Sequence, residues 1–196
     1  LFADVVDSTR LMEEHDAEEA TRRVEVLLER MREAVRQYDG TVNKVQGDGL
    51  MAIFGAPQPR EDHAVRACCA ALSMRRALTA LGPDWPATRI GVHTGEAVLR
   101  SFETDFAPQF DAMGLTVHIA ARVERTASRG DVAVSESTAQ AARDQIEFEP
   151  LGEYRVKGLS HPVSLFKPVR IRTLMASEQF RGGQTANQHF TRLRPL

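Results

Sequence analysis

Two aspartates lie in or beside strongly apolar segments of this sequence. Asp4 lies within LFADVV at residues 1–6, and Asp48 lies between KVQG and GLMAIF. Because an isolated carboxylate is costly to bury, each needs a partner or a metal ion. Gly-Asp-Gly also suits a hairpin turn on conformational grounds alone, which is the simpler interpretation of Asp48. Two carboxylates flanked by strand-like sequence favour a site for hard divalent cations, of the kind that commonly handles phosphate chemistry.

The residues that follow Asp4 suit an anion. The chain runs Asp7-Ser8-Thr9 into a short helical stretch. A strand followed by a tight turn and a helix N-terminus presents backbone N–H groups to a ligand such as a triphosphate. Helix capping by Asp7 and Ser8 explains the same residues, and the sequence leaves both interpretations open.

Hydrophobic periodicity predicts a mixed α/β chain around these residues. Apolar side chains recur at spacings of three and four over residues 17–38 and again over 60–81, which indicates two long amphipathic helices. Gly47-Asp48-Gly49 separates two strand-like runs, 41–46 and 50–54, and predicts a hairpin. The remaining expected elements are strands at 1–6, 88–98, 132–134, 148–156 and 163–169, and a helix at 116–125.

The order of these elements favours an α+β fold. It is related to the ferredoxin-like β-α-β-β-α-β arrangement, an antiparallel-rich sheet with helices packed on one face. In that arrangement the first strand lies next to the hairpin. We therefore expect Asp4 and Asp48 to meet at the same edge of the sheet, although they are far apart in the sequence.

Composition excludes several classes of partner. The 196 residues are 42% apolar and 27% charged, with a formal net charge of −2, which gives no electrostatic case for nucleic acid or an anionic membrane. No apolar run approaches the ~20 residues of a membrane span. The only cysteines, Cys68 and Cys69, are adjacent, which disfavours a disulfide between them and indicates a reduced, cytoplasmic protein.

Residues 1–169 are expected to form one domain, and 170–196 a linker or loose C-terminal tail. The segment 182–188 is polar and aperiodic, which is typical of chain outside a packed core. The first residue, Leu1, already belongs to a strand-like run, so we expect the domain to be truncated at its N-terminus.

Three blocks of the sequence resemble the motifs of class III nucleotidyl cyclase catalytic domains. They are FADVVDST at 2–9, KVQGDGLMAIFG at 44–55 and FDAMGLTVHIAAR at 110–122, in the family's order, with RIGVHTGE at 89–96 between the last two. His118 and the block EDHAVRAC at 61–68 resemble a bacterial subgroup in which the cyclase domain precedes ATPase and repeat regions. That subgroup implies further domains in the full-length chain.

The resemblance implies a role for each motif residue. Asp4 and Asp48 would hold two Mg²⁺ or Mn²⁺ ions, with the Val5 carbonyl as a further ligand. One ion would activate the ribose 3′-hydroxyl and the other would bind the triphosphate. Lys44 would donate to adenine N1, and Asp111 would accept from the exocyclic amino group, a pattern that guanine reverses. Surface charge is the simpler interpretation of these two residues outside the motif context.

Arg122 matches the arginine that stabilises charge on the transferring phosphate, a role suited to a planar group with five donors. His118 replaces the asparagine that the family uses to orient the ribose. A histidine ring nitrogen can also donate a hydrogen bond, but with a different reach and shape.

The family resemblance therefore implies an adenylate cyclase that converts ATP to 3′,5′-cyclic AMP and pyrophosphate. Its active sites would form between two catalytic domains, so this chain would act as a homodimer through its catalytic face. A catalytically weak nucleotide-binding or dimerisation module is one alternative. Guanylate cyclase is another, disfavoured by Lys44 and Asp111.

Overall fold

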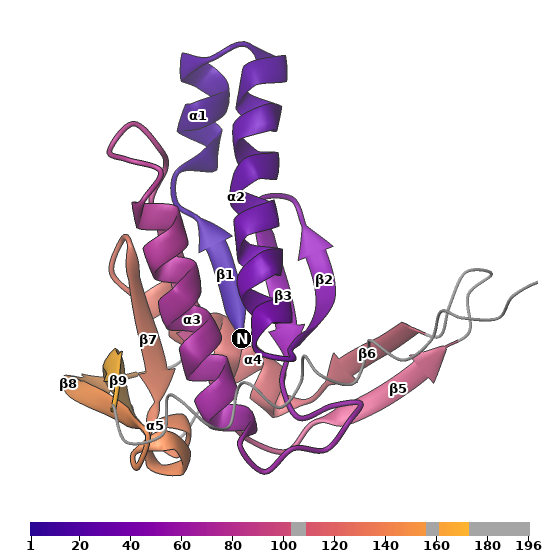
Figure 1. The fold of residues 1–196 in the computed structure, drawn as a ribbon, viewed down its shortest axis with the longest axis vertical. Helices are drawn as coiled ribbons and strands as arrows, with labels where there is room; N and C mark the ends of the chain where they lie inside the picture. The colour runs from indigo at the N-terminus through magenta and orange to yellow at the C-terminus, as the bar shows by residue number, and fades with distance from the viewer. Residues whose placement is uncertain (103–108, 156–160, 173–196) are drawn as a thin grey trace, which may run out of the picture.

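A seven-stranded β-sheet forms the centre of the computed structural model, which describes residues 1–102, 109–155 and 161–172 (Figure 1). The strand order is β2-β3-β1-β4-β7-β9-β8. The β4–β7 pair is parallel and the other pairs are antiparallel. The strands are β1 (Phe2–Val5), β2 (Thr41–Gln46), β3 (Gly49–Ile53), β4 (Thr88–Val92), β7 (Asp131–Ser135), β8 (Ile146–Tyr154) and β9 (Val163–Ile171).

A separate antiparallel hairpin projects from this sheet and consists of β5 (Val98–Phe102) and β6 (Gln109–Met113) (Figure 1). The helices of the described residues are α1 (Ser8–Glu14), α2 (Ala17–Gln37), α3 (His63–Thr79), α4 (Leu115–Thr126) and α5 (Glu136–Ala142). The Asp16 side chain caps the start of α2 by accepting a hydrogen bond from the Glu19 backbone N–H at 2.9 Å. None of these helices is long and apolar enough to cross a membrane.

Helices cover both faces of the sheet. α2 and α3 pack on one face, in a core shared with Val132 and Val134 of β7. α4 packs on the other face, where Ile119 and Val123 cluster with Ala133, the β7 residue between those valines. The expectation that all helices pack on one face was therefore wrong. The central strands carry apolar side chains on both faces, so each face needs a covering layer.

The α+β class and the antiparallel-rich sheet are confirmed, and so is the hairpin at residues 47–49. The strand expected over 88–98 is confirmed as far as Val92, where β4 ends, and its extension to 98 was wrong, because the chain then leaves the sheet to form β5. No helix was expected over Glu136–Ala142, where the structure has α5. Most of the tail expected at 170–196 lies outside the described residues, so the domain boundary stays a prediction.

Candidate active site

Asp4 and Asp48 meet at one edge of the sheet, as expected. β1 pairs with β3 so that Asp4 lies opposite Gly49, the residue after Asp48. A methyl group on Gly49 would lie 2.8 Å from Asp4 Oδ1 and 2.9 Å from the Ala3 carbonyl oxygen. Glycine at this position therefore leaves the space that the Asp4 carboxylate occupies. The turn that presents Asp48 also depends on Gly47, whose φ of 61° is rarely adopted by other residues.

The charges around Asp4 suit a hard cation. Burial and the nearby charge of Asp48 raise the pKa of Asp4, while Arg89, the Val5 backbone N–H and Arg125 act against that rise. Carboxylate and carbonyl oxygens are the ligands that Mg²⁺ prefers, and it usually keeps water and substrate phosphates as its other ligands. No cluster of three or more His, Cys, Asp or Glu occurs in the described part of the chain. The two carboxylates therefore fit Mg²⁺ or Mn²⁺ that takes its other ligands from water and substrate, and the Val5 carbonyl as a further ligand stays a prediction.

Arg89 and Glu124 also belong to this site, and sequence reasoning assigned them no role. Arg89 lies opposite Asp4 in the β1–β4 pair. Its Nε lies 3.6 Å from Glu124 Oε1, and neither atom has a hydrogen-bond partner among the described residues. Burial, followed by the charge of Asp4, raises the pKa of Glu124 to about 7, against the attraction of Arg89 and Arg125. No local pattern in the sequence marks this pair, because Arg89 lies on β4 and Glu124 on α4.

α4 approaches β4 very closely at this point. A methyl group on Gly91 would lie 2.1 Å from the Glu124 backbone nitrogen and 2.4 Å from its Cα. Atoms cannot come so close, so glycine at position 91 lets the helix backbone rest directly on the strand. That contact fixes α4 beside the strand that faces Asp4.

Lys44 and Asp111 form an ion pair, with Lys44 Nζ 2.8 Å from Asp111 Oδ1. Lys44 lies on β2, the outermost strand of the main sheet, and Asp111 lies on β6, so the contact joins that strand to the hairpin. The Lys44 side chain is 53% exposed and that of Asp111 is 26% exposed. The structure thus brings together both residues of the predicted base-reading pair, with the lysine half exposed and Asp111 Oδ1 buried.

Arg122 and His118 lie four residues apart on α4, which puts them on the same face of the helix. His118 is exposed and Arg122 is half-buried. Arg122 forms no ion pair with any residue that the structure describes. Among the predicted site residues, the structure thus brings Asp4 near Asp48 and pairs Lys44 with Asp111, while Arg122 has no carboxylate partner among the described residues.

The two open interpretations of Asp7 have different outcomes. Asp7 occupies the position before α1 with φ of 57°, and its side chain makes no capping hydrogen bond. Its carboxylate is paired instead with Arg129. The capping interpretation of Asp7 was therefore wrong. Anion binding at this turn stays a prediction.

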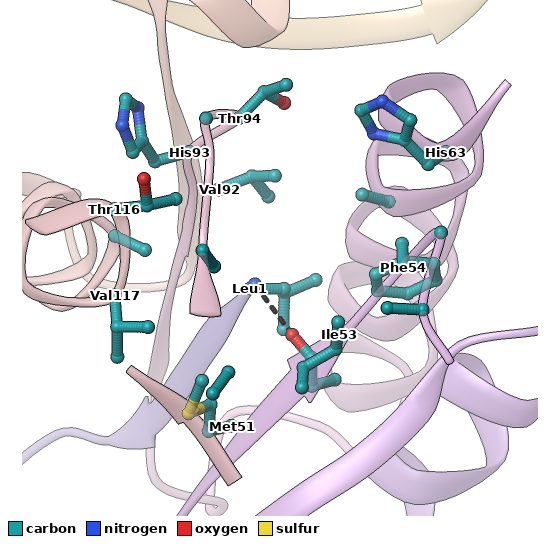
Figure 2. A pocket seen from close by; sticks show the side chains of 18 of the residues that line it. Leu1, Met51, Ile53, Phe54, His63, Val92, His93, Thr94, Thr116 and Val117 are labelled. Atoms are coloured by element: carbon teal, nitrogen blue, oxygen red, sulfur yellow. Dashed lines mark hydrogen bonds between the residues drawn. The ribbon is translucent and has the colours of Figure 1, made fainter. Parts of the chain in front are cut away.

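A cavity of about 360 Å³ lies at the end of β1 opposite to Asp4. Figure 2 shows Leu1, Met51, Phe54, His63 and His93 around it. The Leu1 amine donates a hydrogen bond to the Ala52 carbonyl there, at 2.9 Å. No residue with a predicted catalytic or binding role lines this cavity, so it is not part of the candidate site.

The fold and the order of these motifs define a nucleotide cyclase domain. The sequence profile of the adenylate and guanylate cyclase catalytic domain matches residues 1–168, and the chain belongs to this family. It is 32% identical to Adenylate cyclase 1 of Rhizobium meliloti (strain 1021) over 180 residues, which cover 87% of this chain and 27% of the relative. The chain thus spans about a quarter of that relative's length.

Solved structures support the same assignment. The adenylyl cyclase CyaB from P. aeruginosa superposes with a TM-score of 0.78 at 30% identity, covering 88% of this chain and 93% of that one. The guanylyl cyclase Cya2 superposes with a TM-score of 0.77 at 24% identity, covering 89% and 92% of the two chains. The latter likeness concerns the fold alone. The expected family is confirmed, and the choice between adenine and guanine needs a separate argument.

Proposed function

We propose that this domain is an adenylate cyclase that converts ATP to 3′,5′-cyclic AMP and pyrophosphate. The observation that carries the proposal is the Lys44–Asp111 ion pair at 2.8 Å, whose lysine side chain is 53% exposed. A lysine donor beside a carboxylate acceptor complements N1 and the 6-amino group of adenine. Buried polar groups left unpaired by the wrong base are a strong source of discrimination, which disfavours GTP.

Asp4, Asp48 and the Val5 carbonyl would hold two divalent cations. When bound, these ions would stabilise charge on the attacking 3′-oxygen and on the pyrophosphate leaving group. In the reaction the 3′-oxygen loses its proton and bonds to the α-phosphorus, and the bond to the bridging oxygen of pyrophosphate breaks. Arg122 would stabilise charge on the transferring phosphate, and His118 would orient the ribose.

The complete site would form between two copies of this chain. Asp4 and Asp48 would come from one protomer, and Lys44, Asp111 and Arg122 from the other. Apolar side chains support this arrangement, because Val98 on β5 is 65% exposed and Leu115 at the start of α4 is 56% exposed. A second copy would cover them, and each homodimer would have two equivalent sites.

The test is formation of cyclic product by the purified protein with Mn²⁺ and either ATP or GTP. We expect cyclic AMP from ATP and much less product from GTP. Lys44→Glu combined with Asp111→Cys should lower kcat/KM for ATP by at least about tenfold, since two polar contacts to the base are lost. The matched control is Arg170→Glu with Glu147→Cys, which breaks an ion pair of the same 2.8 Å length on β8 and β9.

An unchanged preference for ATP over GTP in the double variant would refute base reading by this pair. Absence of cyclic product from the parent protein in saturating Mn²⁺, with nucleotide binding intact, would favour the nucleotide-binding module. Preferential use of GTP would establish the guanylate cyclase alternative. The domain's expected location in the cytoplasm, where ATP is formed and used, rests on the same proposal.

A further inference from the structure

Asn43 lies beside the proposed base-reading pair, at an irregularity in the pairing of β2 with β3. Val42 pairs with Ala52 of β3, but Lys44 pairs with Met51, so the register shifts by one residue between them. Asn43 is therefore the extra residue of a β-bulge. Bulges change the direction of the side chains around them and are common next to functional sites.

The Asn43 side chain links β2 to the β5–β6 hairpin. Its Nδ2 donates a hydrogen bond to the backbone carbonyl oxygen of Phe110 on β6. A carbonyl can only accept, so the amide nitrogen must be the atom that faces it. Asn43 Oδ1 is buried and has no hydrogen-bond donor among the described residues. The Asn43 side chain therefore donates a hydrogen bond to the hairpin backbone and makes no other hydrogen bond with the described residues.

This link is directly adjacent to the ion pair. Asn43 precedes Lys44 on β2, and Phe110 precedes Asp111 on β6, so consecutive residues make the two contacts. Solvent at the half-exposed lysine weakens the ion pair, although its other atom, Asp111 Oδ1, is buried. A hydrogen bond to a backbone carbonyl acts on the strand itself. The position of β6 relative to Lys44 therefore depends on Asn43 as well as on the ion pair.

We propose that Asn43 is a positioning residue for base recognition. It holds β6 where the Asp111 carboxylate meets the 6-amino group of adenine, without touching the nucleotide itself. Because Lys44 and Asp111 are proposed to read adenine, the role of Asn43 rests on that proposed function. Its loss should weaken selection of the amino group while leaving the chemistry at phosphorus unchanged.

The experiment compares ATP with purine riboside 5′-triphosphate, which lacks the 6-amino group. Asn43→Asp keeps the size of the side chain but turns an oxygen acceptor toward the Phe110 carbonyl. We expect the KM for ATP to rise about tenfold, the factor expected for one net hydrogen bond, with kcat changed less than about twofold. The KM for the analogue should change less than about threefold, because Asp111 has no amino group to meet.

The matched control is Thr41→Val, on the same strand. The Thr41 hydroxyl donates to the Ala56 carbonyl at 3.4 Å, away from the hairpin. Thr41→Val should leave the ratio of the KM for ATP to the KM for the analogue unchanged. Asn43→Ala removes the hydrogen bond without adding charge and should reproduce the pattern of Asn43→Asp.

Equal effects of Asn43→Asp on both nucleotides, or no effect on either, would overturn the proposal. Loss of folding in both Asn43 variants, seen by circular dichroism, would also overturn it by making the residue a stabilising one. Asp111→Cys distinguishes failure of base reading by Asp111 from failure of the positioning role of Asn43. If it impairs both nucleotides equally, base reading by Asp111 fails; if it impairs ATP selectively and Asn43→Asp does not, only the role of Asn43 fails.

Discussion

Replacement of Glu124 by glutamine should change how the stability of this domain depends on pH. The side chain is 6% exposed, and burial followed by the charge of Asp4 raises its pKa from 4.5 to about 7. A carboxyl group whose pKa is raised by folding favours the native state while it is protonated. Its stabilising contribution is complete below pH 4.5 and is lost as the pH rises through 7. Glu124→Gln removes this titration and keeps an oxygen facing Arg89.

The size of the effect follows from the shift. Between pH 5 and pH 8 the parent should lose about 2 to 3 kcal/mol relative to Glu124→Gln, since each pKa unit corresponds to about 1.4 kcal/mol. For a domain of this length that is a relative change in melting temperature of roughly 5 to 10 °C. The variant should be the more stable protein at pH 8.

The assay is thermal unfolding of both proteins from pH 5 to pH 8 in EDTA, which keeps cations away from Asp4. Glu153→Gln is the matched control, because Glu153 lies exposed on β8. Its melting temperature should follow that of the parent at every pH. Parallel curves for the parent and Glu124→Gln would refute the reasoning, because they would mean that folding does not move the titration of Glu124 into this pH range.

Three further experiments test the arrangement of the site. Gly91→Ala places a methyl group 2.1 Å from the Glu124 nitrogen and should lower the free energy of unfolding by about 3 kcal/mol or more in urea denaturation; a loss below about 1 kcal/mol would contradict the contact. Asp4→Ala and Arg122→Ala chains should each be inactive, and mixing them should restore part of the turnover, because about half of freely exchanged dimers would contain one intact site. No recovery, with exchange confirmed, would rule out a shared site. His118→Asn should keep or raise turnover and His118→Ala should lower it severalfold; full activity of the alanine variant would limit His118 to a structural role.

Local patterns were sufficient to predict much of this fold. The hairpin at Asp48 was predictable because its glycines determine the turn, and α2 because its apolar residues repeat with helical period. The face on which α4 packs was not predictable. Helical periodicity shows that Ile119 and Val123 face a core, but not which side of the sheet supplies it.

The residues of the candidate site also differ in whether the sequence alone could predict them. Asp4 and Asp48 could be found because carboxylates in apolar surroundings are conspicuous in a sequence. Glu124 could not, because its partner Arg89 lies on a different element and only the folded chain brings them together. The bulge at Asn43 was equally hidden, since a register shift depends on the partner strand and leaves no local signature.

The contact between Gly91 and Glu124 has a mechanical consequence. Because the backbones of α4 and β4 lie so close together here, α4 cannot slide or roll along β4 without steric overlap. In the proposed homodimer, any closure around a bound nucleotide would therefore come from elsewhere, either from rigid rotation of one protomer against the other or from bending of the β5–β6 hairpin. Since α4 carries Arg122 and also rests beside Asp4 of its own chain, rotation that tightens one site of the dimer would simultaneously displace a component of the other.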